Sequence, residues 1–328
     1  MGLGVNQVLN MTINEQNYNL AFVFPGQGSQ SVGMLNKLAE AYPQIKQTFE
    51  QASAVLGFDL WNLVENGPEE ELNKTQNTQP AMLAAGVAVW RLWCDKSMVR
   101  PAWMAGHSLG EYTALVCSGA ISFEDGIKLV AERGRLMQQA VPAGVGAMAA
   151  ILGLEDHQVV NTCLEVANGE IVAAANFNAP GQVVIAGQTA AVERAMDALK
   201  ALGAKRALKL PVSVPSHCRL MEGASEQLNE ILQNMTVEMP DVTLIHNADV
   251  KSHGSPEVIR YALKEQLFKP VRWVESVKFM HEQGVSCFVE CGPGKVLMGL
   301  NKRIASDALH MSIFDPDSLN SVLEQLNG

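Results

Sequence analysis

A five-residue run, Gly106-His107-Ser108-Leu109-Gly110, constrains the fold of this 328-residue chain more than any other feature. It fits the pattern G-x-S-x-G, and it stands between a short apolar run, Pro101 to Ala105, and a segment typical of a helix, Leu109 to Cys117. The tight turn needs glycines, because a Cβ at those sites would collide with neighbouring chain. The turn exposes the serine hydroxyl at the amino end of a helix, whose dipole favours developing negative charge. Ser108 is therefore the candidate nucleophile.

The order of the expected elements indicates a small domain inserted within a larger one. From Gly146 onward, a compact series of strand, helix, strand, strand, helix and strand fills about 65 residues, and this βαββαβ order is the ferredoxin-like plan. The inserted elements are expected at 146–153, 155–167, 170–176, 182–187, 189–202 and 205–210. The flanking α/β elements are expected at 21–24, 36–56, 79–95, 109–117, 122–140, 242–246, 255–267, 271–283 and 285–290, with a terminal helix after Gly294. We expect an α/β catalytic domain at 18–143 and 211–328, an inserted small domain at 144–210, and a disordered N-terminal extension at 1–17.

A serine hydroxyl is a weak nucleophile and needs a neighbouring base, so one of the seven histidines should serve. His217 follows Pro211-Val-Ser-Val-Pro-Ser, in which two prolines fix an extended approach just after a strand. A lone histidine is more often structural, and His246 is the main rival. His107 is adjacent to Ser108 in sequence, so its side chain points away from that of Ser108. This favours a packing or positioning role for His107 over the role of base. The remaining histidines are expected at the surface: His157, His253, His281 and His310.

Arg133 lies on a largely apolar face of the helix that is expected to begin at Ser122, whereas Arg135 falls among polar neighbours and should be solvated. The start of that helix resembles a capping box, with Asp125 three residues after Ser122. A guanidinium on an apolar face is costly unless it is paired. Its partner is either a structural carboxylate or a substrate anion, and spacing alone slightly favours the carboxylate.

Charge and composition exclude several classes of protein. With 24 Lys and Arg against 34 Asp and Glu, the net charge of −10 repels nucleic acid and anionic membranes. The longest apolar run, Ala81 to Trp90, is far shorter than the roughly 20 residues that span a bilayer. The first basic residue is Lys37, so a signal peptide is not expected. The six cysteines include no C-x-x-C pair, which favours reduced thiols in the cytoplasm and argues against a metal site.

Two glycine-rich segments do not fit nucleotide-binding patterns. The third glycine of G-x-G-x-x-G after Gly26 and Gly28 is replaced by Ser31, and Gly292-Pro-Gly-Lys295 lacks the phosphate-loop spacing. We therefore expect no cofactor and no metal.

Several ordered motifs together resemble the malonyl-CoA:acyl carrier protein transacylase family, from about Ala21 to Ile304. They are FVFPGQGSQ, GHSLGEY, the Arg133 helix with AVPAGVGAMAAILGL, NFNAPGQVVIAG, PVSVPSHC, QLFKPVRW and VECGPGKVLMGL. The resemblance implies a hydrolase-like α/β core with a parallel sheet and an inserted ferredoxin-like subdomain.

Carried over by position, the resemblance implies a role for each matching residue. Ser108 matches the nucleophile and His217 the base, while Arg133 matches the arginine that binds the malonyl carboxylate, which outweighs the structural pair favoured by spacing. Gln27 and the backbone N–H of Leu109 match the oxyanion site, and Gln266 matches a residue whose backbone carbonyl orients the histidine.

The implied activity is ping-pong transfer of malonyl from malonyl-CoA to holo acyl carrier protein in fatty acid biosynthesis, by a cytoplasmic protein expected to be a monomer. A trans-acting acyltransferase of polyketide assembly, a serine esterase or thioesterase, and a non-catalytic interaction module are the alternatives. Because CoA and carrier proteins are acidic, local basic patches should bind them. The candidates are Lys205, Arg206, Lys302 and Arg303.

Overall fold

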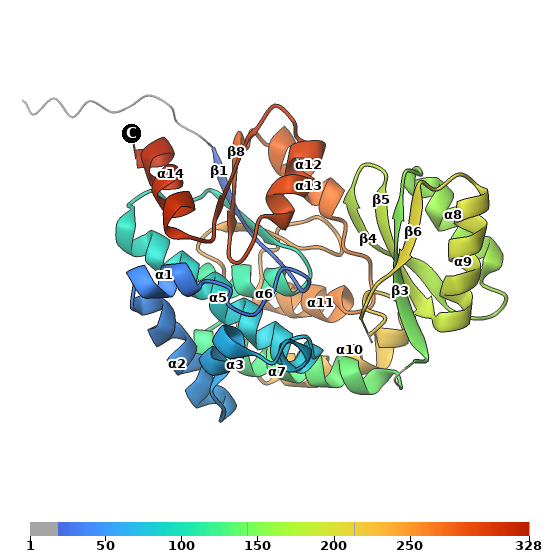
Figure 1. Ribbon diagram of the computed structural model, residues 1–328, viewed down its shortest axis with the longest axis horizontal. Helices are drawn as coiled ribbons and strands as arrows, with labels where there is room; N and C mark the ends of the chain where they lie inside the picture. Colours follow the sequence, from blue (N-terminus) through green and yellow to red (C-terminus); the bar gives the residue numbers. More distant parts are fainter. Residues whose placement is uncertain (1–18, 143, 213, 328) are drawn as a thin grey trace, which may run out of the picture.

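Two separate β-sheets organise the chain in the computed structural model, which describes residues 19–142, 144–212 and 214–327 (Figure 1). The larger sheet is parallel throughout. Its strands, in spatial order, are β7 (Thr243–Ile245), β2 (Trp103–Gly106), β1 (Leu20–Phe24), β8 (Cys287–Cys291) and β9 (Leu309–Ile313). The strands β1 and β8 are buried along their whole length, and they are apolar apart from Glu290 in β8, as expected for parallel strands covered on both faces.

Helices pack on both faces of this sheet (Figure 1). Alternate residues of β1 enter two different cores: Phe22 contacts Trp93 on one face, and Val23 packs in a cluster with Trp273 on the other. The helices of this unit are α1 (Asn36–Ala41), α2 (Gln44–Leu56), α3 (Leu60–Asn66), α4 (Glu69–Leu72), α5 (Thr75–Lys96), α6 (Leu109–Cys117), α7 (Phe123–Ala140), the 3₁₀ turn η1 (Arg219–Met221), α10 (Glu222–Gln233), α11 (Pro256–Gln266), α12 (Trp273–Glu282), α13 (Val296–Ile304) and α14 (Pro316–Asn327).

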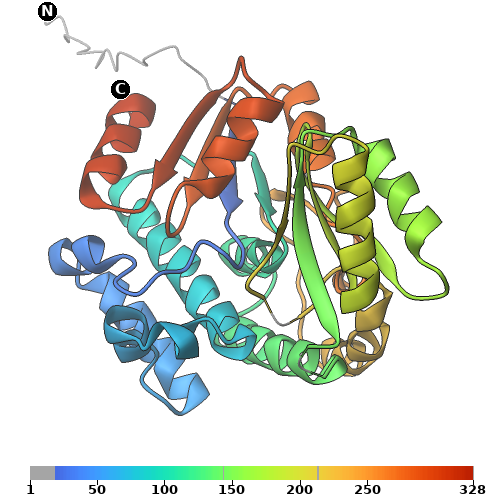
Figure 2. The same cartoon turned by 45° about the vertical axis from the view of Figure 1, so that its right-hand side comes forward.

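The smaller sheet is antiparallel, and two helices cover one of its faces (Figure 2). In chain order its unit contains β3 (Gly146–Leu152), α8 (Asp156–Val166), β4 (Val172–Ala179), β5 (Gln182–Gln188), α9 (Thr189–Ala201) and β6 (Arg206–Lys209). The strand order β4-β5-β3-β6 is that of a ferredoxin-like sheet. Ala149 and Ile151 pack beneath α8 and α9, whereas Met148 lies on the opposite face with Val184 and Cys218.

Backbone and side-chain hydrogen bonds join the small sheet to the larger unit beside the end of β2. Phe177 donates its N–H to the carbonyl of Val271, and Val271 donates to that of Ala175, both at 2.9 Å. His107 Nε2 lies 2.7 Å from Asn178 Oδ1. The turn after β2 is therefore held directly against β4.

The expected fold class is confirmed: an α/β unit with a parallel sheet accompanies a small βαββαβ unit. The expected helix over 36–56 is wrong as a single element, because it divides at Tyr42, which adopts an extended conformation before Pro43. The expectation that the helix after Gly294 is terminal is also wrong, since β9 and α14 follow α13. The short helices α3 and α4, as well as α10, were not predicted.

The proposed domain boundaries at 143/144 and 210/211 stay a prediction. The expected N-terminal extension, residues 1–17, lies outside the described residues. No helix in the described ranges is long and apolar enough to span a membrane.

Candidate active site

The G-x-S-x-G run forms a sharp turn from β2 into α6. Ser108 occupies the N-cap position with φ 51° and ψ −107°, a conformation that L-residues rarely adopt. Neither glycine tolerates a side chain: a Cβ on Gly106 would lie 1.8 Å from the carbonyl carbon of Gly110, and one on Gly110 would lie 2.0 Å from the carbonyl oxygen of Phe24. The close packing of α6 against β1 and the end of β2 therefore leaves room only for a tight turn, and Ser108 adopts its strained conformation in that turn.

Ser108 and His217 meet although 109 residues separate them, and Ser108 Oγ lies 2.7 Å from His217 Nε2. On the other side of the ring, Nδ1 lies 2.8 Å from the backbone oxygen of Gln266. Because a carbonyl can only accept, Nδ1 carries the proton, and Nε2 presents its lone pair to the serine hydroxyl. Burial, and then the charge of Arg133, lower the pKa of His217 to about 3, so the ring is neutral near pH 7.

Arg133 reaches the same point from α7, where it is almost completely buried. Its guanidinium donates to Gln79 Oε1 at 2.8 Å and to Gln266 Oε1 at 2.9 Å, and lies 3.4 Å from Ser108 Oγ. These partners are neutral, and Nε has no partner among the described residues. The structural carboxylate that spacing slightly favoured is thus absent from the described chain, whereas Arg135 forms an exposed pair with Glu132.

A cavity of about 190 Å³ lies above Ser108, between the α/β unit and the small sheet. Ser108, His217, Arg133, Gln27 and Leu109 line its floor. The small sheet contributes Met148, Asn176, Asn178 and Val184. The volume is below the roughly 300–1,000 Å³ of pockets for drug-sized ligands, so the cavity suits a short acyl group.

The positions of Leu109 and Gln27 allow them to face an oxyanion. Leu109 is the first residue of α6, so its backbone N–H has no partner inside the helix. Gln27 follows β1 and lines the same cavity, and its side-chain amide lies 3.4 Å from Thr75 Oγ1. Ser108 cannot contribute its own N–H, because that group donates to Asn247 Oδ1 at 2.7 Å.

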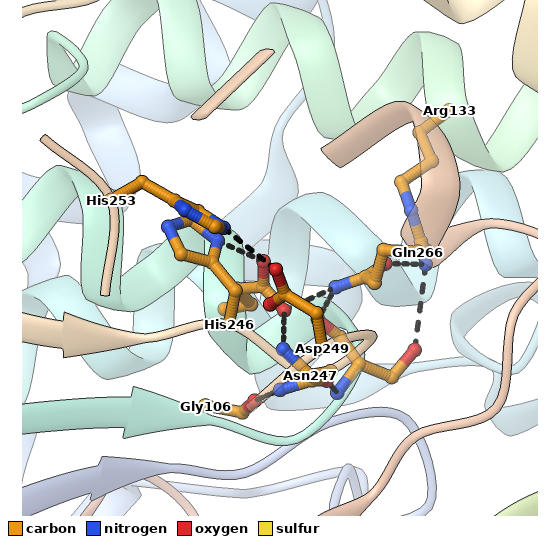
Figure 3. Close-up of polar contacts among 9 residues, drawn as sticks. Gly106, Arg133, His246, Asn247, Asp249, His253 and Gln266 are labelled. Carbon is orange, nitrogen blue, oxygen red and sulfur yellow. Dashed lines mark hydrogen bonds and ion pairs between the residues drawn. The ribbon is translucent and has the colours of Figure 1, made fainter. Parts of the chain in front are cut away.

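The structure also reveals polar groups that the sequence did not single out (Figure 3). Asn247 bridges the turn, since its Nδ2 donates to the carbonyl of Gly106 at 2.7 Å. The carboxylate of Glu111, on the first turn of α6, is completely buried beside His246 and Gln266. The sequence does contain an indication of this role, because Glu111 is the one acid in a mainly apolar helix, and burial of a carboxylate costs free energy unless it has hydrogen-bond partners.

The other histidines lie in different surroundings. His246, the rival base, is occupied by Glu111 at 2.7 Å. The expectation of a surface position is wrong for His310, which is buried and stacks on Phe288. It is also wrong for the His253 side chain, which is only 10% exposed and whose ring lies tilted against that of His246. Among the described residues no cluster of His, Cys, Asp or Glu could hold a metal ion, and all six cysteines are free.

Comparison with known proteins identifies the family. The acyl transferase domain family matches residues 21–312. The malonyl CoA-acyl carrier protein transacylase of Haemophilus influenzae is 56% identical over 307 residues, which cover 93% of this chain and 98% of that protein. A malonyl-transacylase solved in complex with its type II PKS acyl-carrier protein superposes with a TM-score of 0.93 at 56% identity, covering 94% of this chain and 99% of that one.

An acyl carrier protein S-malonyltransferase from Vibrio cholerae also superposes, with a TM-score of 0.91 at 56% identity over 93% of this chain and 99% of that one. The chain therefore belongs to the acyl transferase domain family, among the malonyl CoA-acyl carrier protein transacylases.

Proposed function

We propose that this protein transfers malonyl from malonyl-CoA to the phosphopantetheine thiol of an acyl carrier protein, through a malonyl ester on Ser108. One observation carries the proposal: a hydrogen-bonded Ser108 and His217 lie beside a buried Arg133 that has no carboxylate partner in the described chain. A buried cation of this kind requires an anion, and the malonyl carboxylate supplies one next to the nucleophile.

In the first half-reaction, His217 Nε2 accepts the proton of Ser108 while Oγ bonds to the thioester carbon. The oxyanion that develops faces the backbone N–H of Leu109 and the Gln27 segment. The C–S bond then breaks, and the proton on His217 passes to the CoA sulfur as CoA leaves. The backbone carbonyl of Gln266 takes the place of a triad carboxylate in orienting His217.

In the second half-reaction, the carrier thiol enters the vacated position. His217 accepts the thiol proton as sulfur bonds to the malonyl carbon, the ester bond to Ser108 breaks, and the proton returns to Oγ. Arg133 remains paired with the malonyl carboxylate throughout, because a guanidinium donates two parallel hydrogen bonds to a carboxylate.

Replacement of Arg133 by Ala tests this assignment. Two charged hydrogen bonds contribute about 1.5–3 kcal/mol each, so kcat/KM for malonyl-CoA should fall roughly 150- to 25,000-fold, while slow transfer from acetyl-CoA should change little. The measurement is the rate at which intact mass shows acylated protein, with Ser108→Ala as the control that forms no ester. If kcat/KM falls equally for malonyl-CoA and acetyl-CoA, Arg133 does not recognise the malonyl carboxylate.

A serine esterase shares the elbow, and mixing the protein with malonyl-CoA and holo carrier protein separates the two activities. Malonyl-carrier should accumulate; free malonate as the main product would favour hydrolysis. Absence of any malonyl-protein adduct would favour the non-catalytic module.

We propose that the carrier protein is the one used in fatty acid synthesis. Polyketide assembly is the second candidate pathway, because one 56% identical relative was solved with a type II PKS acyl-carrier protein. Parallel assays with both kinds of carrier protein compare the two pathways.

We further propose that the protein is a cytoplasmic monomer and that it binds its acidic partners through a basic patch, formed by Lys205, Arg206, Lys302 and Arg303. Arg206 and Gln182 both pair with Leu152, and Arg303 donates to Gln182 Oε1, which supports a shared location at one end of the small sheet.

A further inference from the structure

The buried carboxylate of Glu111 accepts hydrogen bonds from three directions. Oε1 lies 2.7 Å from His246 Nδ1, and Oε2 accepts from the backbone N–H of Asn247 at 2.9 Å and from Gln266 Nε2 at 3.1 Å. The carboxylate has no exposed surface and does not touch the cavity. It therefore acts on the site through its partners.

Gln266 is the first of these partners. Its Nε2 donates to the backbone oxygen of Ser108 at 2.8 Å as well as to Glu111, so both amide protons have acceptors on one side. The amide oxygen consequently faces Arg133, which donates to it at 2.9 Å (Figure 3). A reversed amide would set its protons against the donors of Arg133 and its oxygen against the carboxylate. Glu111, together with the carbonyl of Ser108, thus determines which end of Gln266 faces the cation.

Asn247 is the second partner, and it holds the nucleophile. Its side chain accepts from the N–H of Ser108 and donates to the carbonyl of Gly106, both at 2.7 Å, so it clasps the two ends of the strained turn. Glu111 holds the backbone of Asn247 in place, because its Oε2 accepts the hydrogen bond from the Asn247 N–H. One carboxylate therefore anchors the group that orients Arg133 and the group that restrains Ser108.

We propose that Glu111 is a positioning residue that sets the distance between Arg133 and Ser108, and thereby the preference of this site for malonyl over acetyl thioesters. What matters is the reach of the side chain to Gln266 and Asn247. The inference rests on the proposed function, since it concerns the same site.

Two conservative variants separate reach from charge. Glu111→Gln keeps the length of the side chain, and its amide oxygen can accept from Asn247 and Gln266, while its amide nitrogen can donate to His246 Nδ1 when the ring carries its proton on Nε2. Glu111→Asp keeps the charge but withdraws it by one methylene. The shorter side chain should displace Gln266 and Asn247. Because misplacement of active-site groups by about 1 Å can lower the rate on the order of 100-fold, kcat/KM for malonyl-CoA should fall between about 10- and 100-fold in Glu111→Asp.

The readout is the ratio of malonylation to acetylation rates per folded molecule, measured by intact mass. The ratio should collapse in Glu111→Asp and remain within a few-fold of wild type in Glu111→Gln. The matched control is Glu290→Gln, which alters another fully buried glutamate in β8 and should leave the ratio unchanged.

A wild-type ratio in both Glu111 variants, or a larger loss in Glu111→Gln than in Glu111→Asp, overturns the positioning role. If Glu111→Asp does not fold, Asn247→Ala still tests the clasp: it should slow acylation by both thioesters, and unchanged rates overturn that half of the inference. Failure of the wild-type protein to form any malonyl ester would instead overturn the proposed function.

Discussion

Replacement of Gly110 by Ala should separate α6 from β1 and displace Ser108, the proposed nucleophile. The added Cβ would lie 2.0 Å from the carbonyl oxygen of Phe24 and 2.7 Å from its carbonyl carbon. An ordinary contact is about 3.5 Å, so the helix or the strand must move by about 1 Å or more. Both obstacles are backbone atoms in the middle of the molecule, and no flexible side chain can absorb the shift.

The expected cost follows from overpacking at a rigid contact, which destabilises by about 3 kcal/mol. With about 2.1 cal/mol/K of unfolding entropy per residue, that cost lowers the Tm by about 4 °C in a chain of this size. Activity should suffer more than stability. A displacement of about 1 Å between Ser108 and His217 reduces the rate of serine acylation on the order of 100-fold.

Thermal unfolding and the rate of malonyl-serine formation, both compared with Gly299→Ala, test this reasoning. Gly299 lies inside α13 with open space around it, so Ala there should stabilise by about 0.5–1 kcal/mol and leave acylation unchanged. If Gly110→Ala melts and acylates like the wild type, close packing of α6 on β1 does not set the geometry of the turn.

Two further predictions concern pH. Because the pKa of His217 is lowered to about 3, the ring stays neutral in mild acid, and kcat/KM for malonyl-CoA should be flat from about pH 5 to 8. A half-loss of rate near pH 6.5 would show an ordinary histidine instead. Burial raises the pKa of Glu290 from 4.5 to about 7, so the folded state favours the protonated acid and loses stability as pH rises through about 7. The shift corresponds to about 3 kcal/mol, so Glu290→Gln should unfold at a higher temperature than wild type at pH 8.5 and at a similar one at pH 4.5; parallel Tm curves against pH would contradict this.

The elements that could be predicted were those with strong local signals. Ser122 indeed caps α7, since its side chain accepts from the N–H of Asp125. In the insertion, a capping box at Glu155 begins α8. The division between α1 and α2 also has a local signal, because Pro43 disfavours a helical conformation at Tyr42. By contrast, β9 is a five-residue strand with two polar residues, His310 and Ser312, and it becomes a strand by pairing with β8. Only tertiary contacts define such an edge strand.

The candidate site likewise contains residues with a local sequence signal and residues that only tertiary contacts bring together. Ser108 could be proposed from local spacing because one turn fixes its conformation, whereas the choice of His217 over His246 needed the family resemblance, because sequence separation says nothing about which ring reaches the hydroxyl. Each ring nitrogen of His217 has its partner from a different segment, Ser108 Oγ and the carbonyl of Gln266, while His246 instead meets Glu111. The distinction between the two histidines therefore comes from the packing of α6 and α11 around Ser108. A change in the length of the side chain at 111 should disturb this packing through Gln266, with no contact to the His217 side chain, so the malonyl-to-acetyl ratio of the Glu111 variants tests whether the packing positions Arg133.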